Sequence, residues 1–102
     1  MMKDESCSLE RTGDALIIFI DDVFDHAQRK RIQKTCEKQT GIDKYILDFK
    51  HVTRIESSTL GWMLFLRVRL GEDKANITLR NVNKLILEIF RMTKFHELFK
   101  IE

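Results

Sequence analysis

Three consecutive hydroxyl residues, Ser57, Ser58 and Thr59, are the side chains whose type and spacing best suit chemistry. They follow Glu56 and precede an apolar run, which is the pattern of a helix N-terminus. Such a terminus presents unpaired backbone N–H groups and about half a positive charge, so it can accommodate a phosphoryl group. The residues alone leave a plainer interpretation open, in which all three are ordinary helix caps.

The other reactive side chains form no catalytic pattern. The three histidines are far apart and have no C-x-x-C or H-E-x-x-H companion, so we expect no metal site. No nucleotide-binding or nucleophile-elbow glycine motif occurs, and no nucleophile lies beside a base in the sequence. Cys7 and Cys36 are expected to be reduced thiols that pack as small hydrophobes. We therefore expect a protein that is not an enzyme and needs no cofactor.

Length and composition set further limits. The 102 residues fit one domain, 1–102, of which residues 1–6 are expected to be flexible. A formal net charge of +2 is too small to indicate direct nucleic-acid binding. No apolar run approaches the roughly 18 residues that a membrane-spanning helix needs, and residues 1–6 lack the apolar core of a signal peptide. We expect a cytoplasmic protein without membrane insertion.

The first half of the chain predicts a hairpin followed by a helix. Residues 7–20 form the hairpin around a turn at 12–14, and the continuous apolar run of residues 15–20 favours a strand covered on both faces. Asp25 ends the next loop and is a good N-cap for a helix over 26–39. Most basic residues of that helix are assigned to its solvated face, and its inner side is expected to hold Ala27, Arg31, Ile32, Thr35 and Cys36.

The second half alternates strands with helices. Its expected elements are a strand at 45–49, a loop at 51–56, an apolar helix from Ser57 to Leu70, a strand at 76–80, an amphipathic helix from Val82 to Phe90, a helical turn at 95–99 and a last strand at Ile101. The amphipathic helix should bury Leu85, Ile86, Ile89 and Phe90. This order predicts an α/β fold with a single-layer mixed sheet, mostly parallel, an N-terminal β-hairpin, and helices packed against it.

The stretch from Tyr45 to Leu70 resembles the signature of STAS domains, and in particular of bacterial anti-sigma-factor antagonists. Tyr45-Ile46-Leu47-Asp48-Phe49 is similar to the family's strand ending near an Asp. Glu56-Ser57-Ser58-Thr59-Leu60-Gly61 is similar to its Asp-Ser-Ser-Gly-Leu-Gly motif, with Glu56 in place of Asp and Thr59 in place of Gly. The hairpin, the Asp25 loop and the run from Asn81 to Phe99 also fall where the family has similar elements.

The resemblance implies a non-catalytic regulatory module. In the family, the first Ser of the motif is phosphorylated by a serine kinase that is also an anti-sigma factor, and a phosphatase of the PP2C type reverses this. By position that residue is Ser57, with Ser58 as the alternative. The added charge of roughly −1.5 to −2 would act on partner binding. A second hypothesis is a STAS subunit of a transporter or another signalling assembly, acting by protein–protein binding without phosphorylation.

Two sets of residues are predicted to bind a partner. By resemblance, Asp25, Glu56, Ser58 and Thr59 lie beside the phosphorylated serine. On a helical wheel, Leu60, Met63, Leu64 and Val68 cluster on one side and are expected to face the sheet. A second apolar face, which could also form a homodimer, is expected at Trp62, Phe65 and Leu66, with Arg69. The plainer alternative is that another part of the chain covers this face.

Overall fold

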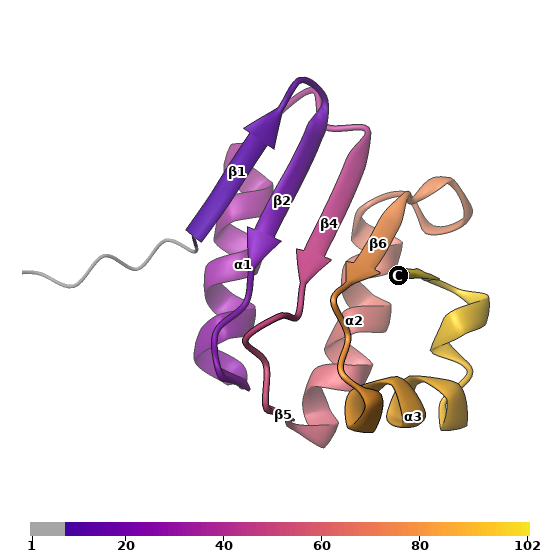
Figure 1. Ribbon diagram of the computed structural model, residues 1–102. Coiled ribbons are helices and arrows are strands. Elements are labelled where there is room, and N and C mark those ends of the chain that lie inside the picture. Colours follow the sequence, from indigo (N-terminus) through magenta and orange to yellow (C-terminus); the bar gives the residue numbers. More distant parts are fainter. Residues whose placement is uncertain (1–7) are drawn as a thin grey trace, which may run out of the picture.

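The protein is a five-stranded mixed sheet with helices packed against it, as seen in a computed structural model that describes residues 8–102 (Figure 1). Residues 1–6 and Cys7, for which flexibility and a reduced thiol were expected, lie outside the described residues. The strand order is β1-β2-β4-β6-β7, with β1 antiparallel to β2 and the other pairs parallel. The strands are β1 (Ser8–Thr12), β2 (Ala15–Phe19), β4 (Lys44–Asp48), β6 (Ile77–Arg80) and β7 (Lys100–Ile101). The predicted α/β class and mostly parallel sheet are confirmed.

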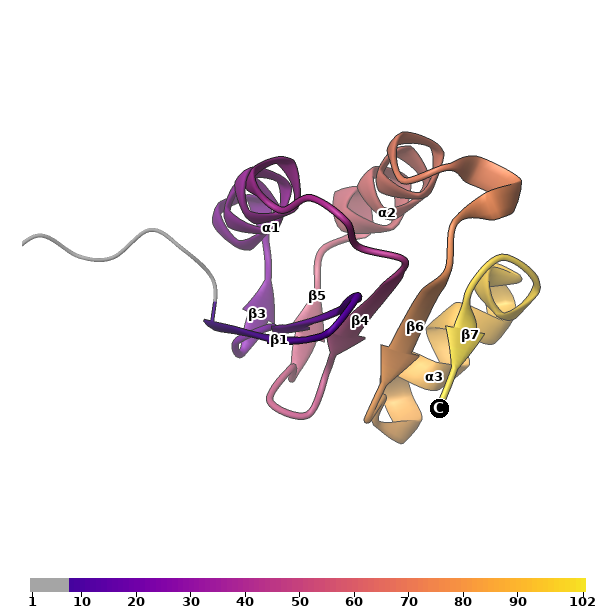
Figure 2. The same cartoon turned by 90° about the horizontal axis from the view of Figure 1, so that it is seen from above.

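Two helices, α1 (His26–Lys38) and α2 (Ser57–Arg69), cover the same face of the sheet (Figure 2). Both connect parallel strands, which requires crossovers of this kind. The third helix, α3 (Lys84–Met92), follows β6 at the end of the strands where α1 and α2 begin (Figure 1). Short 3-10 helices at Glu72–Lys74 and Phe95–Glu97 complete the chain.

A second, two-stranded sheet lies where loops were expected. The strands β3 (Val23–Phe24) and β5 (Arg54–Ile55) pair in parallel, and the backbone N–H of Glu56 donates to the carbonyl of Phe24 at 3.3 Å. Both segments follow neighbouring parallel strands, so they leave the sheet side by side. A strand of two residues is too short to show the alternation of apolar and polar side chains by which a strand is predicted. The sequence therefore does not indicate this pairing.

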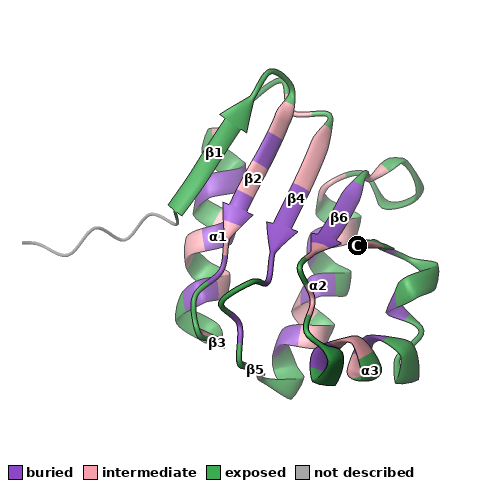
Figure 3. Ribbon diagram, in the orientation of Figure 1, coloured by how far each residue is buried: buried purple, intermediate pink, exposed green. Residues whose placement is uncertain are grey.

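The core lies between the sheet and the helices. Leu16 and Ile18 of β2 are fully buried there, whereas Ile17 and Phe19, which point to the other face, are only half-buried (Figure 3). The expectation that β2 is covered on both faces is therefore wrong, because α1 and α2 pack on one face alone (Figure 2). A chain of aromatic contacts, with ring centroids 5.3–5.7 Å apart, crosses the core through Phe24, Phe49, Phe90, Phe95 and Phe99.

Two predicted helix faces need correction. In α1 the expected Ile32, Thr35 and Cys36 are buried, but Ala27 is exposed and Gln28 takes its place. In α3, Ile86 and Phe90 are buried as expected, Ile89 is half-buried, and Leu85 is 64% exposed. The spacing of apolar residues does not determine how wide the buried face of a helix is. In α3 only a narrow stripe of the helix contacts the rest of the fold.

Phe90 is the best test of the α3 face, since it is fully buried between Phe49 and Phe95. We expect Phe90→Ala to lower the free energy of unfolding by about 3–5 kcal/mol, measured by urea denaturation. The matched control is Leu85→Ala on the exposed side of the same helix, which should change it by less than about 0.5 kcal/mol. Equal losses in the two variants would contradict this orientation of α3.

Asp48 holds the end of β4 to the residues that follow β6. Its carboxylate accepts hydrogen bonds from Arg80 Nη2 at 2.8 Å, from Asn81 Nδ2 at 3.1 Å and from the backbone N–H of Lys50 at 2.8 Å. Burial by itself would raise the pKa of Asp48, but these hydrogen bonds and the positive charge of Arg80 outweigh it and keep the pKa below its usual 3.8. The ionised form is thus the one that the fold stabilises.

This lowered pKa predicts how stability depends on pH. A carboxyl that binds its proton more weakly in the folded state stabilises the fold above the unfolded pKa, and that contribution is lost as the pH falls through the folded pKa. We expect Asp48→Asn to reduce the free energy of unfolding at pH 7 by about 1–3 kcal/mol, with the difference from the wild type shrinking below pH 4. Urea titrations at several pH values measure this. The exposed control Asp43→Asn should show no such convergence.

Candidate functional site

The first turns of α1 and α2 begin side by side at the carboxyl edge of the sheet (Figure 1). Asp25 caps α1 as predicted, because its Oδ1 accepts a hydrogen bond from the backbone N–H of Gln28 at 3.1 Å. At α2 the N-cap is Glu56, which makes no side-chain capping bond, and Ser57 is the first helical residue. The interpretation of Ser57, Ser58 and Thr59 as three caps is wrong, since the pairing of β5 keeps the chain extended through Glu56.

The three hydroxyl groups have different environments. Ser57 is exposed, and no hydrogen bond joins its hydroxyl to another residue of the range 8–102. The exposed Ser58 accepts a hydrogen bond from Arg29 Nη1 at 2.8 Å. Thr59 is fully buried, donates to the carbonyl of Phe24 at 2.8 Å and accepts from Arg29 Nη1 at 2.9 Å. Of the three, Ser57 therefore carries the least constrained nucleophile.

Arg29 of α1 is the residue that sequence reasoning missed. Its side chain is only 13% exposed, and besides contacting Ser58 and Thr59 it lies 3.8 Å from Glu56 Oε1 and 3.2 Å from His26 Nδ1. The sequence pattern predicts that most basic side chains of this helix face solvent. The signal that could have identified Arg29 is its position one turn after the Asp25 cap. This position lies at the start of α1, near the carboxyl ends of the parallel strands, where functional groups often gather.

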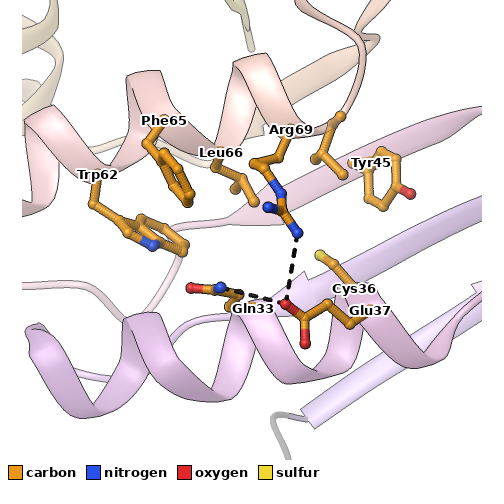
Figure 4. A pocket seen from close by; sticks show the side chains of 9 residues that line it. Gln33, Cys36, Glu37, Tyr45, Trp62, Phe65, Leu66 and Arg69 are labelled. Carbon is orange, nitrogen blue, oxygen red and sulfur yellow. Dashed lines mark hydrogen bonds and ion pairs between the residues drawn. The ribbon is translucent and has the colours of Figure 1, made fainter.

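A groove of about 250 Å³ separates α1 from α2 (Figure 4). It is lined by Gln33, Cys36, Glu37, Tyr45, Trp62, Phe65, Leu66, Arg69 and Leu70. Arg69 Nη2 and Glu37 Oε1 approach to 4.0 Å across it. Burial, helped by the nearby Cys36, raises the pKa of the Tyr45 hydroxyl, so this hydroxyl stays uncharged at neutral pH.

A smaller hollow continues the groove toward the serines. Gln33 and Trp62 line both, and the hollow is completed by His26, Arg29, Lys30 and Ser58. The hollow is basic on the α1 side, whereas the groove is aromatic on the α2 side. The two together connect the first turn of α2 to its apolar surface.

The buried face of α2 only partly coincides with the predicted one, since the two share Met63. Thr59, Met63 and Leu66 are buried, whereas Leu64 and Val68, which were expected to face the sheet, are 39% and 55% exposed. The prediction of an exposed Leu66 is also wrong. The sequence contains apolar residues all around this helix, so the wheel could not define which stripe the sheet covers.

The expected second apolar face is only partly open. Phe65 is 48% exposed, and Trp62 is half-buried with its ring edge-on to Phe24 at 5.9 Å. Thr59 and Leu66 lie beneath the surface, so they can support a docked partner from below. Asp25, Glu56, Ser58, Trp62 and Phe65 reach the surface, and their role in partner binding stays a prediction.

Among residues 8–102, no three His, Cys, Asp or Glu side chains come together in a way that could hold a metal ion. No helix in this part of the chain is long and apolar enough to cross a membrane.

Comparison with known proteins identifies the family. The sequence model of the STAS domain family matches residues 6–102, which is nearly the whole chain. The chain belongs to the STAS family. A STAS-domain containing protein of Pseudomonas aeruginosa (strain UCBPP-PA14) is 31% identical over 90 residues, covering 87% of this chain and 89% of that protein. The resemblance predicted from Tyr45 to Leu70 is thereby confirmed.

Solved structures of SpoIIAA share the fold of this STAS chain. The anti-sigma factor antagonist SpoIIAA in its unphosphorylated form has a TM-score of 0.75 at 19% identity, with 95% of this chain and 88% of that chain covered. The Bacillus cell fate determinant SpoIIAA in the phosphorylated form has a TM-score of 0.71 at 18% identity, with 95% and 91% covered. These likenesses extend over the sheet and all three helices.

Thr59 stands where the family motif has Gly, and substitution can test how much its buried hydroxyl contributes to stability. We expect Thr59→Val to lower the free energy of unfolding by about 1–3 kcal/mol, because it removes the buried hydrogen bonds of the Thr59 hydroxyl to the Phe24 carbonyl and to Arg29. Thr59→Ser keeps the hydroxyl and should lose less. Urea denaturation of both variants measures the difference, and a Thr59→Val protein as stable as the wild type would contradict the role of this hydroxyl.

Proposed function

We propose that this STAS domain is a non-catalytic switch that binds a serine kinase of the anti-sigma-factor type and is controlled by reversible phosphorylation of Ser57. A phosphatase of the PP2C type removes the phosphate. The protein acts in the cytoplasm as one domain, 1–102, in signal transduction and transcription regulation. It binds its partners through protein surfaces and does not contact nucleic acid itself.

The observation that carries this proposal is the exposed Ser57 hydroxyl at the first turn of α2. Ser58 is a weaker candidate, because its hydroxyl is already held by Arg29 at 2.8 Å. A phosphoryl group on Ser57 lies beside the positive end of the helix dipole, which favours an anion there. The likeness to a protein solved in both unphosphorylated and phosphorylated forms supports the same cycle.

The docking surface in this proposal surrounds the serine. Its acidic residues are the two N-caps, Asp25 and Glu56. Ser58 lines the hollow, which shares Trp62 with the groove that also contains Phe65. A partner that covers this surface contacts both the modified serine and the apolar groove. Phosphorylation then changes binding locally, through charge and bulk, without refolding the domain. The same Trp62 face is the surface that we assign to a homodimer.

The intact mass of the protein isolated from its native cells, before and after phosphatase treatment, tests the modification. We expect a species heavier by one phosphoryl group that phosphatase removes. Ser57→Ala should abolish this species while changing the free energy of unfolding by less than about 0.5 kcal/mol, because Ser57 is exposed and is not the N-cap of α2. Ser57→Asp should weaken partner binding. The matched control Ser58→Ala should keep the phosphate. Phosphate that persists in Ser57→Ala and vanishes in Ser58→Ala would contradict the assignment of Ser57.

A further inference from the structure

The hollow beside the first turn of α2 has a basic lining that partner docking does not explain. Three of its residues, His26, Arg29 and Lys30, come from the first turn and a half of α1, and none of the described residues that line it is acidic. Its other side is formed by Ser58 and Trp62 of α2, with Gln33 of α1 at the junction with the groove. A concave surface with several convergent basic groups is suited to an anion.

We propose that this basic hollow binds the phosphoryl group carried by Ser57, and that Arg29 is the residue that reads the phosphorylation state. The inference rests on the proposed function, since it takes Ser57 as the modified residue. It adds a receptor for the phosphate on α1, a different element from the one that carries the serine.

The position of the guanidinium supports this assignment. Arg29 Nη1 lies 2.8 Å from the Ser58 hydroxyl and 3.8 Å from Glu56 Oε1, so it reaches the residues on both sides of Ser57. A phosphoryl group carries three oxygens beyond the serine hydroxyl and extends toward its neighbours. The residue that lines the hollow is Ser58, the neighbour of Ser57. In this proposal Arg29 therefore meets the phosphate on Ser57 by a change of side-chain rotamer, with α1 in place.

Phosphorylation offers Arg29 a stronger acceptor than it now has. Its present partners are the hydroxyls of Ser58 and Thr59, the ring nitrogen Nδ1 of His26 at 3.2 Å, and the Glu56 carboxylate at the long distance of 3.8 Å. Hydrogen bonds between a guanidinium and a phosphate are charge-assisted and about twice as strong as neutral ones, and they form in pairs. The Arg29 side chain is 13% exposed, so solvent screens this attraction less than at an open surface.

The exchange also explains how phosphate on α2 is sensed on α1. Once Arg29 turns to the phosphate, Glu56 loses its cationic neighbour and faces a second negative group. The Ser58 and Thr59 hydroxyls lose the same donor, while Thr59 keeps its hydrogen bond to the Phe24 carbonyl. Glu56 and Ser58 lie on the surface proposed for docking, so one modification rearranges charge on two elements that a partner contacts together.

The test installs phosphoserine at position 57 during translation, by genetic encoding, so it requires no kinase. Failure of the proposed phosphorylation in cells is therefore distinguishable from failure of this inference. Titration followed by ³¹P nuclear magnetic resonance reports the second ionisation of the phosphate alone. The titratable and charged groups around it are His26, Arg29 and Lys30 from α1, together with the two N-cap residues Asp25 and Glu56.

We expect Arg29 to raise the acid dissociation constant of this phosphate by about threefold or more relative to Arg29→Gln. The matched control is Arg31→Gln, which removes the same charge from α1 two residues further on, where the side chain points away from Arg29. It should leave the constant within the error of the wild type. Equal constants in the wild type and Arg29→Gln would overturn the inference.

A further variant and a further measurement also test whether Arg29 contacts the phosphate. Arg29→Lys, which keeps the charge but not the paired donors, should give an intermediate constant. If Arg29→Gln does not fold, the Nε–H resonance of Arg29 in the wild type decides, because it should shift when residue 57 carries phosphate and stay in place if the inference is wrong. Dependence on Arg29 for phosphate on Ser58, but none for phosphate on Ser57, would also overturn it.

Discussion

The site depends on the hydrogen bonds of the buried Thr59 hydroxyl. This hydroxyl donates to the carbonyl of Phe24 and accepts from Arg29, and so joins α2 to β3 and to α1 at one point. The Phe24 carbonyl accepts this bond in the interior, where a lost partner costs most. The first turn of α2 therefore has a defined position relative to α1, and the exposed serines before Thr59 share it.

Parallel strand order is what brings these residues together. The chain leaves β2 and β4 at the same edge of the sheet, and the next helices start from that edge. Asp25 and Glu56, the N-caps of α1 and α2, are thereby neighbours although 30 residues of sequence separate them. The short pairing of β3 with β5 keeps both approaches extended up to the caps.

The surface that results combines two kinds of chemistry. Basic side chains of α1 line the hollow near Ser58, and aromatic side chains of α2, with Tyr45 from the sheet, line the groove that continues it (Figure 4). Charge at one end and apolar area at the other suit recognition of a protein partner, where an anchor in a pocket gives affinity and charge gives specificity.

The sequence by itself determined those features that depend on residues close to one another along the chain. The Asp25 cap, the order of the helices and of the strands in the main sheet, and the serine motif before Leu60 depend on residues a few positions apart, and all of them could be predicted. Only the tertiary structure decided which side of α2 is buried, that Leu85 is exposed, and that Arg29 meets Ser58 and Thr59. Each of these depends on which distant element lies opposite, and contacts between residues about 30 positions apart leave no period or spacing in the sequence.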